Sequence, residues 1–565
     1  MCRPQLNRLT HPPSISNFRS ADPDVGCVSE KEEVGTMRKS ISLASVITII
    51  LCCLSEAKPG QEPNDQSLPA ASATLFYAFP YDGVGASGYS HGKIPYSELI
   101  QGADGNYYGT TTEGGDSSCS DGFGLEGCGT IFKITPGGVE TALFQFTYDS
   151  TTNTAVNGIY PYGGMVQARD GNFYGTTAYG GNPAAGCILG CGVVFKITPA
   201  GKFTLLHQFA GLSSNPAEGA VPTGRLIQAI DGKLYGTTTA GGAVQAYYNQ
   251  GTIFSITTSG AFTTLHQFDN IHGVTDGVNP YAGLVQGKDG NFYGTTYFGG
   301  TTNTGTVFKF SKTGSMTVLH SFVETSHLVY PDGAFLQGAL VQGTDGNLYG
   351  TATQGGVASG SYGTLFKVTT NGKFTNLYDF NPTTGSVFGY YPVAGVIQAS
   401  DGNFYGTTEY GGPSGCDCGT VFEMSVTGIV SQIAQFDDAN TGRWPISAAL
   451  QAADGTLFVT NAKGPSIGSH DPGTIMQINN GLSKPKPTII GFAPTSGKVG
   501  QNITILGTHF VGTTGVSFNG TAAKFAVKST AIVVTVVPPG ASSGRITVTN
   551  AGGSAISVGS FTVLP

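Results

Sequence analysis

The stretch Leu284-Val285-Gln286-Gly287-Lys288-Asp289-Gly290-Asn291-Phe292-Tyr293-Gly294-Thr295-Thr296 decides the fold, because variants of it recur seven times along the chain. Its central aspartate stands at positions 104, 170, 231, 289, 345, 401 and 454. A unit of this length that recurs many times is typical of repeat architectures, in which each unit buries its apolar face against its neighbours. The repeats therefore predict one array rather than a set of unrelated domains.

Each repeat predicts four short antiparallel strands. In the copy around Asp289, the strands are the apolar run that ends at Gln286 and residues 291–296, 305–310 and 317–322. We interpret Asp289-Gly290 as a two-residue hairpin turn with positive φ at both positions. Four antiparallel strands in about 60 residues make one blade of a β-propeller.

Counting the strands predicts a closed ring. Seven copies of the first three strands are present, and the last third strand, residues 473–478, has no fourth strand after it. A spare strand, residues 74–79, precedes the first repeat. Using it to complete the seventh blade removes the exposed edges of the sheet. The sequence thus predicts an all-β fold: a seven-bladed β-propeller over residues 73–480, followed by a further module.

Residues 481–486 read as a linker that ends in a proline-rich run, and residues 487–565 carry apolar side chains at alternate positions. Alternation with period two predicts a small β-sandwich. From Pro487 to Gly497 and from Val537 to Val548, this segment resembles the IPT/TIG domain, which is immunoglobulin-like.

The repeat itself resembles a known family. Its pattern, DGN-[FLY]-YGTT…GG…GT-[VIL]-F-K, is similar to the bacterial GloVer-type tandem repeat over about residues 73–480. The seventh copy departs from the pattern, since Leu457-Phe458-Val459-Thr460 replaces the Tyr-Gly-Thr-Thr core. The resemblance implies an exported protein and carries no enzymatic activity with it.

The amino-terminal end predicts export. Met37-Arg38-Lys39 precedes an apolar run at 41–54 and small residues at 55–57, which is the layout of a secretory signal peptide over residues 37–57. Residues 1–36 fit a spurious or disordered extension. We expect a secreted or cell-surface protein with no transmembrane span after signal removal. The alternative is that the apolar run stays as an amino-terminal membrane anchor.

Charge argues against nucleic acid as a partner. The net charge is −8, charged residues make up 11% of the chain, and no cluster of Lys or Arg follows the signal. Phosphate binding requires a basic face.

Six cysteines follow the signal, in the loops between the second and third strands of three repeats: Cys119 with Cys128, Cys187 with Cys191, and Cys416 with Cys418. Export to an oxidising compartment predicts three local disulfides. The two-residue spacing of the third pair predicts a bridge that is easier to reduce than the others.

Most recurring polar residues are interpreted as structural. The seven Asp-Gly pairs lack the further oxygen ligands of a calcium loop, and the glutamine three positions before each aspartate is assigned to hydrogen bonds between blades. His207, His266 and His320 share one fourth-strand position in successive blades, too far apart for one metal ion. We find no catalytic motif and expect no metal or cofactor. Carboxylates in the loops, including Glu113, Asp116, Glu409 and Asp417, are not marked as pairs by their spacing.

The loops predict where binding would occur. All length variation falls between the fourth strand and the next first strand, and between the second and third strands, so one face of the ring is elaborated. Aromatic rings beside a recurring proline are the candidate binding residues on this face: Tyr96, Tyr160, Tyr162, Tyr281, Tyr390, Tyr391 and Trp444. Exposed rings can stack on sugars, whereas the alternative is that these rings pack as wedges between blades.

Together these patterns indicate a monomeric, non-catalytic protein that binds extracellular glycan or protein ligands through its elaborated face. The alternative is a propeller-based carbohydrate-active or lactone-type hydrolase, which would need a central group of non-repeating polar residues.

Overall fold

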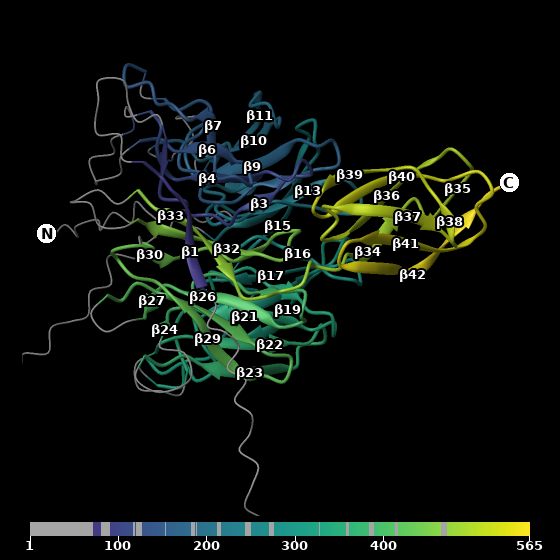
Figure 1. The fold of residues 1–565 in the computed structure, drawn as a ribbon. Helices are drawn as coiled ribbons and strands as arrows, with labels where there is room; N and C mark the ends of the chain where they lie inside the picture. The colour runs from purple at the N-terminus through teal and green to yellow at the C-terminus, as the bar shows by residue number, and fades with distance from the viewer. Residues whose placement is uncertain are drawn as a thin grey trace, which may run out of the picture. The chain divides into compact units, whose positions relative to one another are not determined.

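The computed structural model describes residues 72–565 except for loop segments at 81–90, 117–118, 120–126, 153, 182–186, 188, 212–215, 243–249, 270–275, 327, 357–360, 383–388, 413–415 and 465–471. The predicted extension at 1–36 and the predicted signal at 37–57 lie outside the described residues. The described part is all-β, as the repeats predict, and Figure 1 shows its strands.

Within the described residues, each of the seven repeats forms one antiparallel sheet of strands a, b, c and d. The a strands are β3 (Ile100–Gln101), β8 (Val166–Gln167), β12 (Ile227–Gln228), β16 (Val285–Gln286), β20 (Val341–Gln342), β25 (Ile397–Gln398) and β31 (Leu450–Gln451). The b strands are β4 (Tyr107–Thr111), β9 (Phe173–Thr177), β13 (Leu234–Thr238), β17 (Phe292–Thr296), β21 (Leu348–Ala352), β26 (Phe404–Thr408) and β32 (Leu457–Lys463). The c strands are β6 (Thr130–Ile134), β10 (Val193–Ile197), β14 (Thr252–Ile256), β18 (Thr306–Phe310), β22 (Thr364–Val368), β28 (Thr420–Met424) and β33 (Thr474–Asn479). The d strands are β7 (Glu140–Gln145), β11 (Phe203–Gln208), β15 (Phe262–Gln267), β19 (Met316–Ser321), β23 (Phe374–Asp379), β29 (Val430–Gln435) and, out of chain order, β1 (Ser72–Ala78).

Strand β1 completes the seventh sheet. It pairs antiparallel with β33, with Ser72 opposite Asn479 and Ala78 opposite Thr474 (Figure 1). The spare amino-terminal strand is therefore used as the sequence predicts, and the two ends of the repeat array are joined by backbone hydrogen bonds.

A phenylalanine directly after each d strand fills the same place in every repeat. These residues are Phe146, Phe209, Phe268, Phe322, Phe380, Phe436 and, after β1, Phe79, and all are at most 2% exposed. Each backbone N–H donates to the carbonyl of the glycine before strand c, as in Phe268 to Gly251 at 3.1 Å and Phe79 to Gly473 at 3.2 Å. Phe79 thus supplies to the seventh repeat what the other six take from their own d strands.

The turn between strands a and b differs from the prediction. In repeat 4, Gly287 N–H donates to Asn291 O at 2.9 Å and Gly290 N–H donates to Gly287 O at 2.8 Å. This bonding encloses three residues, 288–290, and only the glycine has positive φ, at 80°. The turn is therefore a type I turn followed by a glycine in the left-handed region, and the prediction of two residues with positive φ was wrong.

The aspartate of each turn is structural, as predicted. Asp289 accepts hydrogen bonds from the Asn291 backbone at 3.1 Å and from the Tyr293 hydroxyl at 2.7 Å. The Tyr-to-Asp bond recurs in repeats 1 to 6. In repeat 7, where Phe458 replaces the tyrosine, Asp454 keeps its bond to the Thr456 backbone.

The recurring glutamine joins neighbouring repeats, which confirms the interpretation from sequence. Its side-chain oxygen accepts from a backbone N–H of the preceding repeat, as in Ile230 to Gln286 at 3.1 Å. The same bond recurs at all seven junctions. The seventh runs from Ala453 to Gln101 at 2.9 Å, so the chain of bonds returns from repeat 7 to repeat 1.

The carboxy-terminal module is a β-sandwich. One sheet contains β34 (Thr488–Ala493), β36 (Asn502–Thr508), β40 (Ile532–Val536) and β39 (Phe525–Ser529) in that order. The other contains β35 (Ser496–Gly497), β42 (Gly553–Val563), β41 (Gly544–Asn550), β37 (Thr513–Phe518) and β38 (Thr521–Ala522). Between them lies a core that includes Ile505, Val516, Ile546 and Phe561, as alternation of apolar residues predicts.

Candidate functional site

The elaborated face is built on a short contact between two loops in each repeat. The loop that enters strand a pairs with the residues that follow strand b, as in β2 (Gly92–Lys93) with β5 (Glu113–Gly114) and β24 (Gly389–Tyr390) with β27 (Tyr410–Gly411). In repeat 7 the strand β30 (Arg443–Pro445) pairs with β32. Other repeats make a single bridge at this place, as between Ile159 and Tyr179. The side chains at these positions vary from repeat to repeat, so they can form a site that repetition alone does not supply.

Three of the predicted binding rings stand at a backbone position with positive φ. The residue before the recurring proline, or before Leu336 in repeat 5, has φ between 54° and 62° in every repeat: Ile94, Tyr160, Val221, Asn279, Phe335, Tyr391 and Trp444. Its carbonyl accepts a hydrogen bond from the end of strand b, as at 3.0 Å from Glu409 N–H to Tyr391 O. Because aliphatic residues hold the same backbone geometry, the aromatic side chains are not required by it.

These three rings, and Tyr390 next to Tyr391, differ in how they are packed. Tyr160 is only 2% exposed and belongs to the core of repeats 1 and 2, so the expectation of an exposed ring is wrong there and the wedge alternative holds. Tyr390 and Tyr391 pack against Tyr410, with ring centres 5.5 and 5.8 Å apart. Trp444 is half-buried and has the Arg443 guanidinium 5.2 Å from its ring centre.

The residue after the proline lies four positions before strand a and holds three more of the predicted rings, Tyr96, Tyr162 and Tyr281, all half-buried. Tyr96 meets Tyr162 edge to face with ring centres 5.1 Å apart, although they belong to repeats 1 and 2. Tyr281 in repeat 4 contacts Tyr297 at 5.2 Å. Tyr96 and Tyr162 therefore contact each other across repeats, whereas Tyr281 contacts a ring of its own repeat.

Electrostatic coupling brings residues of distant repeats together. Burial raises the pKa of Tyr96, and the nearby Glu409 of repeat 6 and Tyr281 of repeat 4 raise it further. Burial also raises the pKa of Tyr162, with Tyr179, Tyr96 and Glu113 adding to the effect. Tyr96, Tyr281 and Glu409 belong to repeats 1, 4 and 6, so this interaction links repeats that are not neighbours in the chain. We call the set the axial cluster: Tyr96, Tyr162, Tyr179, Tyr281, Tyr391 and Glu409.

Glu409 is the carboxyl of the axial cluster. It is 2% exposed, and its Oε2 atom has no hydrogen-bond partner among the described residues. Burial raises its pKa to about 8, and a hydrogen bond with Tyr410 opposes that rise. Its equivalents in the neighbouring repeats 5 and 7 are Thr353 and Ala462, so this acid is a non-repeating feature.

Two further non-repeating charges face each other across repeat 2. Arg225 of repeat 3 forms an ion pair with Glu98 of repeat 1, with Nη1 and Oε1 3.0 Å apart. The equivalent residue in repeat 2 is Gly164, where an added Cβ would lie 3.5 Å from both the Arg225 side chain and the Ser97 side chain. The small residue thus leaves room for the pair along the a strands.

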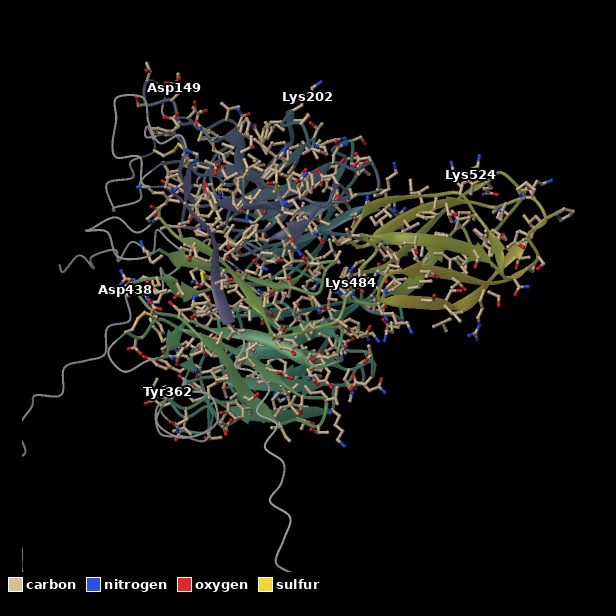
Figure 2. The ribbon with its side chains drawn as sticks, viewed as in Figure 1. Asp149, Lys202, Tyr362, Asp438, Lys484 and Lys524 are labelled. Atoms are coloured by element: carbon tan, nitrogen blue, oxygen red, sulfur yellow. A yellow bond between two sulfur atoms is a disulfide. The ribbon has the colours of Figure 1, made fainter. Side chains whose placement is uncertain are left out.

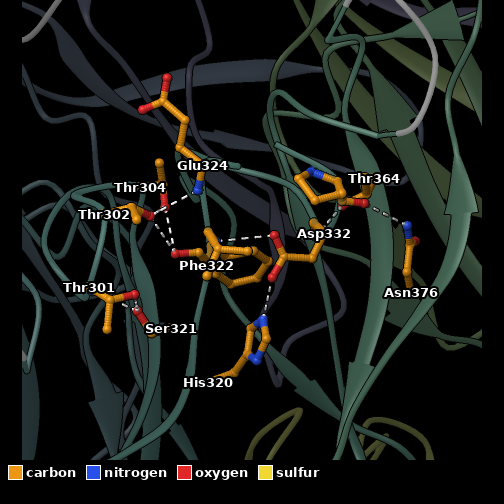
Figure 3. Close-up of polar contacts among 12 residues, drawn as sticks. Thr301, Thr302, Thr304, His320, Ser321, Phe322, Glu324, Asp332, Thr364 and Asn376 are labelled. Atoms are coloured by element: carbon orange, nitrogen blue, oxygen red, sulfur yellow. Dashed lines mark hydrogen bonds and ion pairs between the residues drawn. The ribbon is translucent and has the colours of Figure 1, made fainter. Parts of the chain in front are cut away.

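Each of the three histidines lies beside a carboxylate of the loop between strands d and a. His320 Nε2 lies 2.8 Å from Asp332 Oδ2, and the other oxygen of Asp332 accepts the Val323 backbone N–H at 3.2 Å (Figure 3). His266 and Asp276 repeat this arrangement at 2.7 Å, and His207 stands 3.5 Å from Glu218. Each histidine has its own carboxylate in its own repeat, and no group of three potential metal ligands occurs among the described residues.

The cysteines of the loops between strands b and c lie at disulfide distance in the three predicted pairs: Cys119 with Cys128, Cys187 with Cys191, and Cys416 with Cys418. Their Cα atoms are 5.0, 5.3 and 5.1 Å apart, and Figure 2 draws such bonds in yellow. The described residues contain no helix long and apolar enough to cross a membrane.

Sequence reasoning missed Tyr179, Tyr297 and Tyr410, together with the Glu98–Arg225 pair. The signal was present, because these residues stand at repeat positions that vary between copies, and Tyr179 and Tyr410 share one such position. Glu113 and Glu409 were recognised as carboxylates in the loops, but the alignment of repeats did not show that Glu409 reaches Tyr96.

Three solved structures of low sequence identity resemble this chain. A fungal alcohol oxidase in complex with copper aligns at a TM-score of 0.41 and 12% identity, over 85% of this chain and 98% of its own. A polysaccharide lyase described as an ulvan lyase aligns at 0.43 and 12%, over 71% and 94%. A putative gluconolactonase aligns at 0.27 and 10%, over 55% and 87%. No curated protein matches the sequence.

Two protein-family models match the sequence. The model for the Gloeobacter/Verrucomicrobia repeat matches residues 79–215, 119–338 and 325–523, and the model for the IPT/TIG domain matches residues 487–563. The repeat matches together span residues 79–523, which is most of the chain, and the IPT/TIG match coincides with the carboxy-terminal sandwich. The chain belongs to the Gloeobacter/Verrucomicrobia repeat family and ends in an IPT/TIG domain.

Proposed function

We propose that this protein is a secreted or cell-surface receptor that binds glycans at the axial cluster, without chemical turnover. The observation that carries the proposal is the ring contact between Tyr96 of repeat 1 and Tyr162 of repeat 2, together with the electrostatic effect of Tyr281 and Glu409 on Tyr96. Repetition does not require these residues at their positions. Tyrosine rings offer flat apolar surfaces, and their hydroxyls can exchange hydrogen bonds with sugar hydroxyls.

Two features support export. The amino-terminal layout fits a signal peptide over residues 37–57, and three cysteine pairs at disulfide distance suit an oxidising compartment. The IPT/TIG domain would act as a spacer or protein-contact module. Amino-terminal sequencing of the exported protein tests this part, and a mature end that still precedes residue 37 would refute it.

The binding test uses the purified protein on an array of extracellular polysaccharides and oligosaccharides. Tyr96→Ala and Tyr281→Ala each remove one ring of the axial cluster, and we expect each to weaken binding about tenfold or more, a loss of at least 1.4 kcal/mol. Tyr148→Ala is the matched control, since this tyrosine lies in the loop after strand d, outside the axial cluster. Binding that resists both axial variants would refute the site, and a loss confined to unfolded variants would favour the wedge alternative.

A hydrolase is the second candidate, and Glu409 is the observation that favours it. An acid whose pKa is raised to about 8 by burial can act as a proton donor at neutral pH. Glycoside hydrolysis needs a second carboxyl within about 5–10 Å, and Glu113 is the carboxyl whose charge acts on the neighbouring Tyr162. Release of reducing ends from a bound glycan, abolished in Glu409→Gln, would support the hydrolase over the receptor.

A further inference from the structure

The bridge between Cys416 and Cys418 encloses a single residue, whereas the other two bridges join cysteines 9 and 4 positions apart. The enclosed residue, Asp417, is exposed, Cys416 is partly exposed and Cys418 is fully buried. A bridge across one residue has little freedom to relax, and strained or exposed disulfides are those that thiols reduce most readily. A thiolate from solvent therefore meets this bridge at Cys416.

The backbone around this bridge is held by hydrogen bonds that do not involve sulfur. Cys418 O accepts the backbone N–H of Trp444, in repeat 7, at 2.9 Å. The next residue, Gly419, donates its N–H to Gly411 O at 2.8 Å. The residue between the cysteines, Asp417, has φ of 46°.

Repeats without cysteine at these positions have the same backbone arrangement. In repeat 5, Tyr362 takes the place of Cys418, and its carbonyl accepts the Tyr391 N–H at 2.8 Å. Ser361 takes the place of Asp417 and also has a positive φ, 55°. Repeat 4 has the same arrangement at Asn303, Thr304 and Phe335. The loop therefore keeps this backbone without a bridge, so the bridge can open and close while the repeat stays folded.

The buried sulfur can be accommodated as a thiol. Cys418 Sγ lies 3.5 Å from Cys416 O, within reach of a weak S–H···O hydrogen bond. The core cluster that contains Cys418 is otherwise apolar and includes Val421 and Phe436. A neutral thiol is stable in such surroundings, whereas a thiolate is poorly solvated. The sulfur of Cys418 therefore takes up a proton when the bridge opens.

The charge beside the bridge selects among thiols. Asp417 is the neighbour of both cysteines in the chain, and its carboxylate is exposed. An exposed carboxylate repels an approaching anion and attracts a cation, with an energy that is modest in water. Thiols with a positive charge, or with none, should therefore react faster here than thiols with a negative charge.

We propose that the Cys416–Cys418 bridge is a reversible thiol–disulfide exchange site of the folded protein, and that its substrates are small thiols without negative charge. A substrate thiolate attacks Cys416 Sγ, the S–S bond breaks, and Cys418 Sγ leaves and gains a proton. A second substrate thiolate attacks the substrate sulfur of the mixed disulfide and releases Cys416. In total, two thiols are oxidised to one disulfide, and the bridge gains their two electrons and two protons.

The test follows reduction of the oxidised full-length protein at pH 8 by cysteamine, which is cationic, or by 2-mercaptoethanesulfonate, which is anionic. Samples are quenched with iodoacetamide, alkylated cysteines are mapped by mass spectrometry, and circular dichroism reports on the fold. We expect Cys416 and Cys418 to be alkylated at least about tenfold faster than the other bridged cysteines, without a change of the spectrum. Adding cystamine should restore the bridge. The slower cysteines are Cys119, Cys128, Cys187 and Cys191.

Asp417→Asn is the matched variant for the choice of thiol. The ratio of the cysteamine rate to the mercaptoethanesulfonate rate should fall about fivefold from its wild-type value. Asp149→Asn, which removes an exposed carboxylate of repeat 1, should leave the ratio unchanged. An unchanged ratio in Asp417→Asn would overturn the substrate class. Equal rates at all three bridges, or alkylation of Cys416 and Cys418 only as the folded spectrum is lost, would overturn the exchange site.

Discussion

Replacing Phe79 by alanine should destabilise the ring as much as replacing a phenylalanine inside it. Phe79 is 2% exposed, its ring lies 5.2 Å from Phe132 and its backbone bonds to Gly473. Truncating a buried phenylalanine removes its transfer free energy and leaves a cavity, which together cost about 3–5 kcal/mol. Because Phe268 occupies the equivalent place in repeat 3, Phe268→Ala should cost a similar amount.

Urea unfolding followed by fluorescence and circular dichroism measures both variants against the wild type. Leu75→Ala is the control, because Leu75 lies on the same strand β1 but is 47% exposed, and it should cost under about 1 kcal/mol. If Phe79→Ala cost less than about 1 kcal/mol while Phe268→Ala cost 3 or more, strand β1 would not be an integral part of the seventh sheet and the argument for closure would fail.

The remaining predictions concern an acid, a glycine and the cysteines. Glu409 keeps its proton up to about pH 8 in the folded state but only to about pH 4.5 when the protein is unfolded. The free energy of unfolding should therefore fall by roughly 3 kcal/mol between pH 5 and 8 relative to that of Glu409→Gln. Parallel curves of unfolding free energy against pH for the two proteins would contradict this. Gly251→Ala should lower the free energy of unfolding by at least about 1–2 kcal/mol, because φ is 96° and the new Cβ would lie 2.7 Å from Pro280 Cδ. Gly314→Ala has open space around the new Cβ and should cost only the backbone strain. Equal shifts of the melting temperature in the two variants would disprove the packing explanation. Peptide mass mapping of the oxidised protein should recover Cys119 bonded to Cys128 and Cys187 bonded to Cys191, and free thiols at these positions would argue against an oxidising compartment.

The repeat pattern predicted most of the fold, because each strand is bounded by residues with a fixed geometric role. Asp289-Gly290 marks the turn, the glycine before strand c requires positive φ, and Gln286 bonds to the preceding repeat. The turn type was wrong because a single Asp-Gly pair does not distinguish a two-residue loop from a three-residue loop. That distinction depends on which flanking residues pair, here Gly287 with Asn291.

The candidate site was only partly predictable. The proline beside each ring located the right loops, but residues on either side of it have different roles: Tyr160 is buried between repeats, whereas Tyr162 reaches the axial cluster. The electrostatic effect of Glu409 in repeat 6 on Tyr96 in repeat 1 depends on how the repeats are arranged, which no pattern within a repeat can express.

The pairing of β1 with β33 also sets the order of events in folding. The hydrogen bond between Thr74 and Gln477 joins residues 403 apart in the chain, whereas the ladders within repeats 1 to 6 each span only a few tens of residues. Forming such a distant contact costs a large loop-closure entropy, so the contact forms late. The seventh sheet cannot be completed until residue 479 is available, and a chain halted before that point keeps β1 unpaired. An exposed strand of this kind invites pairing with another chain, so production or export that stalls inside the array should yield aggregates rather than a smaller stable ring.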